Sequence, residues 1–170
     1  MRPLALLLLP PALRASAQTG PATPPVNDLP NPYTTVEGWA KLPGGRPWGS
    51  TSAVAIDNDG KSVWVAERCG ANSCAQSSLP SVLKFDASGN LVKRFGGGMI
   101  MSPHGIHVDR DNNIWAVDFS CTGGTAPIDP NTPPPPPRGH QIIKFSPDGR
   151  VLMTLGKAGG GRDSAFFWQP

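Results

Sequence analysis

The stretch "SPHGIHVDRDNNIWAVD", residues 102–118, decides the fold class because its pattern occurs twice in the chain. Alternating apolar and polar residues around an Asp- and Asn-rich centre predict two strands joined by a tight turn. Residues 54–68, "VAIDNDGKSVWVAER", show the same order of a strand, an Asp-rich turn and a strand that contains tryptophan. A repeated hairpin predicts an all-β chain built from copies of one unit.

Each predicted hairpin is followed by a second pair of strands, in "SVLKFDASGNLVKRFG" at 81–96 and in "HQIIKFSPDGRVLMTLG" at 140–156. The unit is therefore four strands long and recurs after roughly fifty to sixty residues. A partial copy precedes it at 38–57, and a further glycine-rich crossing follows at 150–170. Short strands with turn signals and no helical periodicity predict the blades of a β-propeller.

Two blades with fragments do not close a ring, so we expect an incomplete N-terminal part of a propeller, about two to three blades long. The alternative is a small chain that builds its ring from several copies. In the first case, residues 33–170 expressed alone would be prone to aggregate and would lack a sharp unfolding transition.

The first 17 residues, "MRPLALLLLPPALRASA", predict a secretory signal peptide, because a basic residue precedes an apolar run and a small-residue cleavage site. We expect a secreted or periplasmic protein with no membrane span, since the apolar run is too short to cross a bilayer. Residues 18–32 predict a Pro-rich linker and residues 33–170 the folded part. The Pro-rich segment 119–139 predicts a stiff surface loop rather than a ligand for an SH3-type domain.

The charge of the chain argues against a nucleic-acid partner. Its fifteen Lys and Arg exceed its twelve Asp and Glu by three, but Arg2 and Arg14 lie in the predicted signal peptide. The mature chain would have a formal charge of +1 and no basic patch.

The three cysteines predict one disulfide. Cys69 and Cys74 in "ERCGANSC" lie close enough to close a small loop in an exported protein. Cys121 is left either as a free thiol or with a partner outside this chain. The spacing lacks the CxxC pattern of redox sites, which favours a structural role for the bridge.

Other motifs predict connections rather than ligand sites. The glycine-rich stretches "GGGM" and "GKAGGGR" lack the pattern of a phosphate-binding loop and follow strands with no helix behind them. The turns "DNDG" and "DRDNN" lack the alternate carboxylates of a calcium-binding loop, and their composition is that of hairpin turns.

Three side chains near strand ends are candidates for a function. His104 begins an inner strand and is aligned with Ser52 in the preceding copy, so its side chain is expected to reach the central channel and to bind a ligand there. The alternative is a packed histidine, because a zinc site needs three or four ligands and one imidazole does not make one. His107 lies on the opposite strand face and is expected to pack between blades. Arg68 ends a strand beside the cysteine loop; it is either an ordinary surface arginine or a braced group that binds a carboxylate through both arms of its guanidinium.

The segments "SAVAIDNDGKSVWVAER", "PHGIHVDRDNNIWAVD", "HQIIKFSPDGRVLMTLGKAG" and "FFWQP" together resemble the first half of peptidyl-α-hydroxyglycine α-amidating lyase and its bacterial NHL-repeat relatives. The resemblance is collinear from about residue 37 to residue 170. It implies a six-bladed propeller and cleavage of a small peptide-like substrate, a peptidyl-α-hydroxyglycine, to a peptide amide and glyoxylate. The alternative is a non-catalytic extracellular propeller that binds a protein or a carbohydrate.

The resemblance also implies a role for four residues. His104 would be one of three histidine ligands of a catalytic zinc ion, and the backbone carbonyls of Val54 and Ile106 would bind a structural calcium ion, which prefers hard oxygen ligands. Arg68 would steady the carboxylate of the substrate. In the family a tyrosine acts as the base, and the only tyrosine here, Tyr33, precedes the first blade, so this chain alone would lack part of the site.

Overall fold

A computed structural model describes residues 28–119 and 138–160 of the protein. The chain divides into two compact units, Met1–Thr35 and Val36–Pro170, of which the second contains all the described strands. The predicted signal peptide, most of the Pro-rich loop, Cys121 and the terminal "FFWQP" lie outside the described residues. Within the described ranges, no helix is both long enough and apolar enough to cross a membrane.

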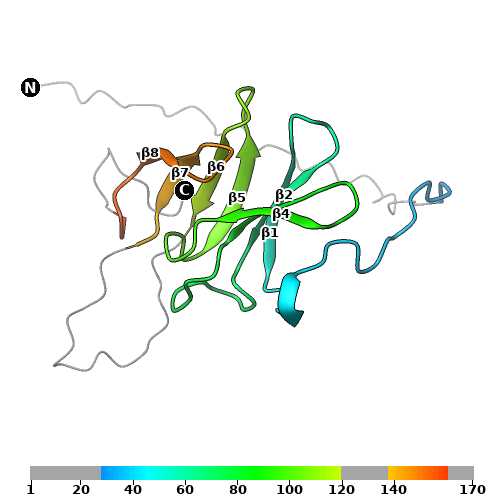
Figure 1. Cartoon of the computed structure of the whole chain (residues 1–170), viewed down its shortest axis with the longest axis horizontal. Coiled ribbons are helices and arrows are strands. Elements are labelled where there is room, and N and C mark those ends of the chain that lie inside the picture. Colours follow the sequence, from blue (N-terminus) through cyan, green and yellow to red (C-terminus); the bar gives the residue numbers. More distant parts are fainter. Residues whose placement is uncertain (1–27, 120–137, 161–170) are drawn as a thin grey trace, which may run out of the picture. The chain divides into compact units, whose positions relative to one another are not determined.

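The second unit is all-β, as predicted. Its described residues form a single 3-10 turn, η1 (Pro43–Gly45), and two four-stranded antiparallel sheets with the strand orders β1-β2-β3-β4 and β5-β6-β7-β8 (Figure 1). The first sheet comprises β1 (Thr51–Ile56), β2 (Val63–Glu67), β3 (Val82–Phe85) and β4 (Leu91–Phe95). The second comprises β5 (Pro103–Val108), β6 (Ile114–Asp118), β7 (Gln141–Phe145) and β8 (Val151–Leu155).

The two sheets have the same register, which confirms the repeat. Val54 pairs with Val65 in the first hairpin, and Ile106 pairs with Ala116 in the second. The first strand of each sheet carries one extra residue opposite its partner, because the register shifts between Thr51 and Ala53 and again between Pro103 and Gly105. The outer strands β4 and β8 also show matching register shifts.

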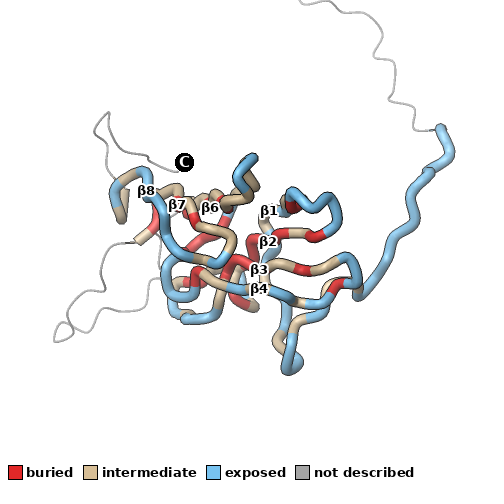
Figure 2. Tube along the Cα trace, turned by 45° about the horizontal axis from the view of Figure 1, so that its top comes forward, coloured by how far each residue is buried: buried red, intermediate tan, exposed pale blue. Residues whose placement is uncertain are grey.

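A hydrophobic core joins the two sheets. Trp64 and Val82 lie on the face of the first sheet that packs on Ile114, Ile143 and other residues of the second. The rings of Phe95 and Phe145, from β4 and β7, lie 5.1 Å apart between centroids. Figure 2 shows that the buried residues concentrate on the central strands, whereas β8 is exposed along its length.

The opposite face of the first sheet is covered by the segment that precedes it in the chain. Val65, Leu83 and Phe85 form a second cluster there, and Trp39 and Leu42 pack on it. The central strands β2 and β3 of the first sheet are therefore buried on both faces.

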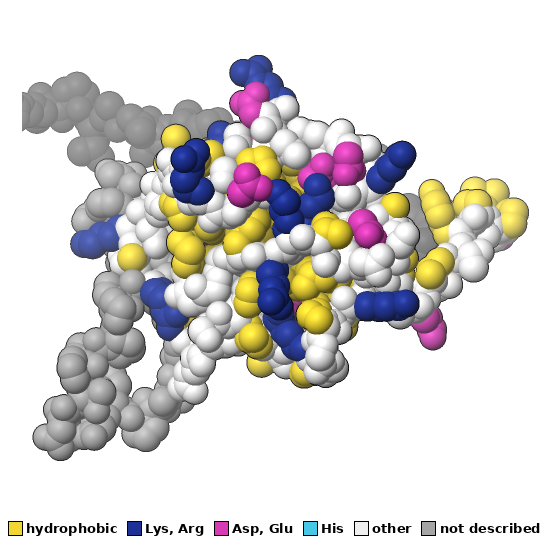
Figure 3. All heavy atoms as spheres, in the orientation of Figure 1, with side chains coloured by type: hydrophobic (Ala, Val, Ile, Leu, Met, Phe, Trp, Pro, Cys, Tyr) yellow, Lys and Arg dark blue, Asp and Glu magenta, His cyan; other side chains and the backbone are white. Residues whose placement is uncertain are grey.

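The second sheet lacks such a cover among the described residues. Its outer strand exposes four apolar side chains, Val151, Leu152, Met153 and Leu155. Figure 3 shows hydrophobic side chains interspersed with lysine and arginine on the face in view.

In both hairpins an aspartate follows the first strand directly. Asp57 accepts hydrogen bonds from the Trp64 indole at 2.7 Å and forms an ion pair with Lys84 at 2.7 Å. Burial acts to raise the pKa of Asp57, but the bonds from Lys84 and Trp64 outweigh it and hold that pKa below its usual value of 3.8. The second sheet repeats the arrangement with Asp109, Trp115 and Lys144. These contacts support the interpretation of both Asp-rich segments as turns.

Gly149 shows why a glycine is needed where the sheets meet. It lies in the turn between β7 and β8 with φ +86°, and a Cβ atom there would lie 2.6 Å from Cγ of Phe95. A larger residue would be strained and would also push the turn away from the first sheet.

Candidate functional site

The site contains Arg68, which follows β2 in the first sheet. Its Nε donates to the carbonyl oxygen of Pro103 at 3.2 Å, and its Nη1 donates to the side-chain and backbone oxygens of Asn72 at 2.9 and 3.3 Å. Its backbone N–H donates to the Ser50 carbonyl at 3.1 Å. The guanidinium is therefore held by both sheets, because Pro103 begins β5.

His104 lies beside this guanidinium. Its Nδ1 is 3.5 Å from Nη2 of Arg68, and its ring packs on Phe119 with 4.7 Å between centroids. Since a guanidinium has no acceptor atom, a hydrogen bond between the two requires Nδ1 of the neutral imidazole to accept and places the ring proton on Nε2. The structure thus brings together two residues that are 36 positions apart in the chain.

A β-bulge explains why His104 is exposed. It is the extra residue at the register shift in β5, and Ser52 is the extra residue at the equivalent shift in β1. A bulge turns a side chain away from the regular alternation of the strand. Ser52 uses this orientation to donate its hydroxyl to the Pro103 carbonyl at 2.6 Å, while the His104 side chain is left accessible.

His107 lies outside the core shared by the two sheets, and its expected packing between blades stays a prediction. It is exposed, and it pairs with Trp115 in the ladder of β5 and β6. Trp115 and His107 lie on the face of the second sheet that is turned away from the first, because their neighbours Ile114 and Ala116 face the shared core.

The predicted disulfide between Cys69 and Cys74 is confirmed, with 5.2 Å between the Cα atoms. It closes the loop that carries Asn72. The loop is fixed further by backbone hydrogen bonds from Ser50 to the Ala71 carbonyl at 2.8 Å and from Cys74 to the Met101 carbonyl at 2.7 Å. A rigid loop therefore holds the residue that accepts from Arg68.

Glu67 supports the same loop from inside the protein. It is fully buried, and its Oε1 accepts from the backbone N–H groups of Gly49 and Gly70, each at 2.6 Å. Its Oε2 forms an ion pair with Arg46. Because Gly70 follows Cys69 directly, the buried carboxylate fixes the beginning of the disulfide loop.

Asp118 occupies the equivalent position at the end of β6. Its two oxygens accept from the backbone N–H groups of Met101 and Ser102 at 3.0 and 2.7 Å. Burial raises the pKa of Asp118 above its usual value, although both hydrogen bonds act in the opposite direction.

Sequence reasoning missed Asn72 and Glu67 as parts of this site. In the sequence, Asn72 is one of four residues between Cys69 and Cys74, and Glu67 precedes Arg68 in the motif "VAER". The available signal was a polar side chain enclosed by two cysteines and close in sequence to an arginine.

The contacts of Arg68 also change the expected mode of carboxylate binding. Nε and Nη1 already donate to protein oxygens, so neither pair of parallel N–H groups is free for a two-armed contact. The remaining donor among the described contacts is on Nη2, beside His104. The geometry therefore favours contact with one ligand oxygen.

The positive charge of Arg68 has no carboxylate partner among the described residues. Its three oxygen acceptors are two backbone carbonyls and one side-chain amide, and its fourth contact is with the neutral imidazole of His104. By contrast, Arg46, Lys84, Lys93 and Lys144 each form an ion pair with an Asp or a Glu. Arg68 thus combines a fixed position with an uncompensated charge.

The residues expected to bind calcium and zinc supply part of what each ion requires. Val54 and Ile106 occupy equivalent register positions in β1 and β5, two strands that lie at sheet edges and contact each other. Backbone carbonyls at such edges are suitable ligands for calcium. A ring nitrogen of His104 becomes available to zinc only when the hydrogen bond with Arg68 is broken, because that bond uses Nδ1 and leaves the proton on Nε2. No group of three His, Cys, Asp or Glu residues able to hold a metal occurs within residues 28–119 and 138–160.

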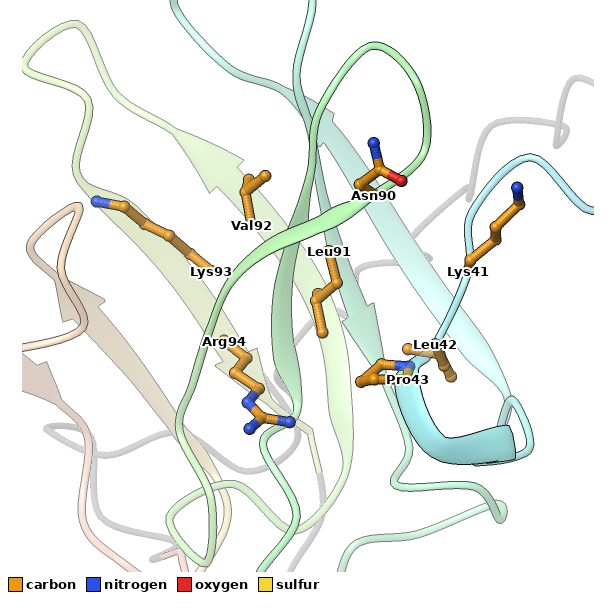
Figure 4. Close-up of a pocket in the computed structure, with 8 residues that line it drawn as sticks. All are labelled: Lys41, Leu42, Pro43, Asn90, Leu91, Val92, Lys93 and Arg94. Atoms are coloured by element: carbon orange, nitrogen blue, oxygen red, sulfur yellow. The ribbon is translucent and has the colours of Figure 1, made fainter.

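A separate surface pocket of about 490 Å³ lies between β4 and the segment that contains η1 (Figure 4). In Figure 4, the side chains of Leu91 and Arg94 extend toward Leu42 and Pro43, whereas those of Lys41 and Lys93 point away. Neither Arg68 nor His104 lines this pocket. Its residues are Lys41, Leu42, Pro43, Asn90, Leu91, Val92, Lys93 and Arg94.

Comparison with known proteins identifies no family. No protein-family model matches the chain, and no curated protein matches it. A structural genomics protein of unknown function from Bacteroides thetaiotaomicron VPI-5482 is similar in structure, with a TM-score of 0.44 and 18% sequence identity over 72% of this chain. The similar region spans 27% of that protein, so this chain corresponds to about a quarter of its length.

Proposed function

We propose that this chain is part of an exported β-propeller of the NHL-repeat type, with six blades in the complete ring. Support comes from two sheets of identical strand order and register that pack face to face through one core. The exposed apolar residues of β8 are consistent with a further sheet beside it. The disulfide is compatible with an oxidising, extracellular environment.

We propose further that the complete protein is a zinc-dependent lyase that acts on peptidyl-α-hydroxyglycine. The observation that carries this proposal is the contact between Arg68 and His104. The family resemblance assigns Arg68 to the carboxylate of the substrate and His104 to the catalytic zinc ion. Arg68 presents an uncompensated charge for the carboxylate of the substrate, and the exposed imidazole of His104 lies at its side.

The reaction conserves all atoms and requires no oxidant. The bond between the α-carbon and the amide nitrogen breaks, the hydroxyl loses its proton as the aldehyde of glyoxylate forms, and the nitrogen takes up a proton to give the amide. Zinc held partly by His104 would supply a Lewis acid for the hydroxyl oxygen. Arg68 would hold the carboxylate so that the bond to be broken is correctly oriented.

The test uses protein expressed from the complete reading frame that contains this chain. Wild type is expected to contain one zinc ion and to release glyoxylate from a peptidyl-α-hydroxyglycine. His104→Ala should lose most of the zinc, because two remaining histidines do not complete the ligand set. Arg68→Ala should keep the zinc and show a higher KM or a lower kcat.

His107→Ala is the matched control, because His107 is exposed on the same strand but does not contact Arg68. It should leave both zinc content and turnover unchanged. Full zinc content in His104→Ala would refute the ligand assignment. Wild type that contains no zinc and releases no glyoxylate would favour the alternative, a non-catalytic propeller that binds a protein or a carbohydrate.

A further inference from the structure

We propose that Asn72 is a positioning residue for Arg68, and that its neutral side chain preserves the charge of Arg68 for a ligand with a single carboxylate. The nature of this ligand rests on the proposed function. The positioning role rests on the geometry of the described residues alone.

Asn72 contacts Arg68 twice. Its side-chain Oδ1 and its backbone oxygen both accept from Nη1, and these two bonds restrain rotation of the guanidinium. The bond from Nε to the Pro103 carbonyl fixes the other side of the group. Nη2 is consequently directed toward His104 and remains the donor for an incoming ligand oxygen.

Asn72 is itself held in one orientation. The hydroxyl of Ser50 donates to Oδ1 at 3.0 Å, so this oxygen accepts from two groups at once. Because both partners act as donors here, the amide must direct its oxygen, not its nitrogen, toward Arg68. The disulfide between Cys69 and Cys74 restrains the backbone on both sides of Asn72.

The neutrality of Asn72 is as important as its position. An aspartate there would still accept from Arg68, but it would place a negative charge against the guanidinium. The resulting ion pair would compete with a ligand carboxylate for the same positive charge. The amide holds Arg68 without neutralising it, which an aspartate would not do.

Two variants of Asn72 separate its effect on the position of Arg68 from the effect of its neutral charge. Asn72→Ala removes the side-chain acceptor, and Asn72→Asp keeps the acceptor while adding charge. Ser73→Ala is the control, because Ser73 lies in the same loop and its hydroxyl bonds to the Met101 carbonyl instead of to Arg68. Arg68→Lys assigns the Nη1–H signals of Arg68 in ¹⁵N NMR spectra of the protein expressed from the complete reading frame that contains this chain.

The ligand probe is N-acetylglycine, and N-acetylglycinamide is its uncharged counterpart. Wild type is expected to bind the acid in preference to the amide and to show slowly exchanging Nη1–H signals for Arg68, because Nη1 donates to Asn72. Asn72→Asp should retain those signals and lose about tenfold in affinity for N-acetylglycine. Asn72→Ala should lose both the signals and the affinity, whereas Ser73→Ala should resemble wild type.

Each part of the inference has an outcome that overturns it. If Asn72→Asp binds N-acetylglycine as tightly as wild type does, the charge argument is wrong. If Asn72→Ala retains the slowly exchanging Nη1–H signals, the side chain of Asn72 does not position Arg68. If wild type fails to bind the acid, the ligand assignment is wrong. None of these measurements depends on zinc or on glyoxylate release, so a failure of the proposed lyase activity would be recognised separately.

Discussion

Replacement of Glu67 by glutamine should destabilise the protein strongly although the two side chains have nearly the same shape. Glu67 is fully buried, and the side chain of its partner Arg46 is only 14% exposed. In Glu67→Gln, the amide oxygen can take the place of Oε1 and still accept from Gly49 and Gly70. The amide nitrogen then faces Arg46, and two donors oppose each other.

The expected loss is about 3 kcal/mol in the free energy of unfolding. Removing one partner of a buried ion pair costs about 3–5 kcal/mol, because the remaining charge stays desolvated without compensation. The lower end applies here because Arg46 retains some contact with solvent. If the amide rotates to face Arg46 with its oxygen, both backbone bonds are lost instead, at about 1–3 kcal/mol for each buried donor left without a partner.

Urea denaturation of the protein expressed from the complete reading frame that contains this chain measures this loss, and Lys93→Met provides the control. Lys93 also forms an ion pair, with Asp148, but the two side chains are 40% and 83% exposed. An exposed pair contributes about 0–1 kcal/mol, so the control should unfold at almost the same urea concentration as wild type. A loss below about 1 kcal/mol in Glu67→Gln would refute the view that this carboxylate holds the Arg68 loop.

Two further predictions concern the turns and the disulfide. Asp57 and Asp109 have lowered pKa values in the folded protein, so the unfolded chain binds more protons at low pH. The free energy of unfolding should therefore fall as the pH drops below about 3.8, which is the usual pKa of an aspartate. Urea midpoints measured between pH 6 and pH 3 test this, and Asp57→Asn should make the midpoint depend less on pH. Replacing Cys69 and Cys74 by alanine together should lower the free energy of unfolding by about 2 kcal/mol, and an unchanged urea midpoint would contradict this.

The local sequence pattern was sufficient to predict the strands and their pairing. Period-two alternation and Asp- or Gly-centred turns are local signals, and both hairpins form where those signals lie. The disulfide was predictable for the same reason, because Cys69 and Cys74 are only five positions apart. Alternation and turn composition therefore carried most of the information about the two sheets.

The contacts of the site depend on residues that are distant in sequence. Glu67 accepts from Gly49 because a crossing segment passes very close to it, and a Cβ at Gly49 would lie 2.6 Å from backbone atoms of Ala71. That approach is set by the packing of the first sheet, which no short pattern encodes. The uncharged groups that accept from Arg68 were likewise not predictable from the sequence, because Pro103 contributes only its backbone oxygen.

The equivalent bulges in β1 and β5 indicate how one scaffold position serves two purposes. Ser52 and His104 are the extra residues of the two bulges, so the backbone presents both side chains in the same way. The short hydroxyl of Ser52 reaches the Pro103 carbonyl, and Arg68 donates to that same oxygen. Together they hold the residue immediately before His104, which fixes the start of β5. The side chain of Ser52 in the first repeat thus helps to position the accessible imidazole of His104 in the second. The two bulges have the same backbone geometry, and they differ in role because one carries a serine and the other a histidine.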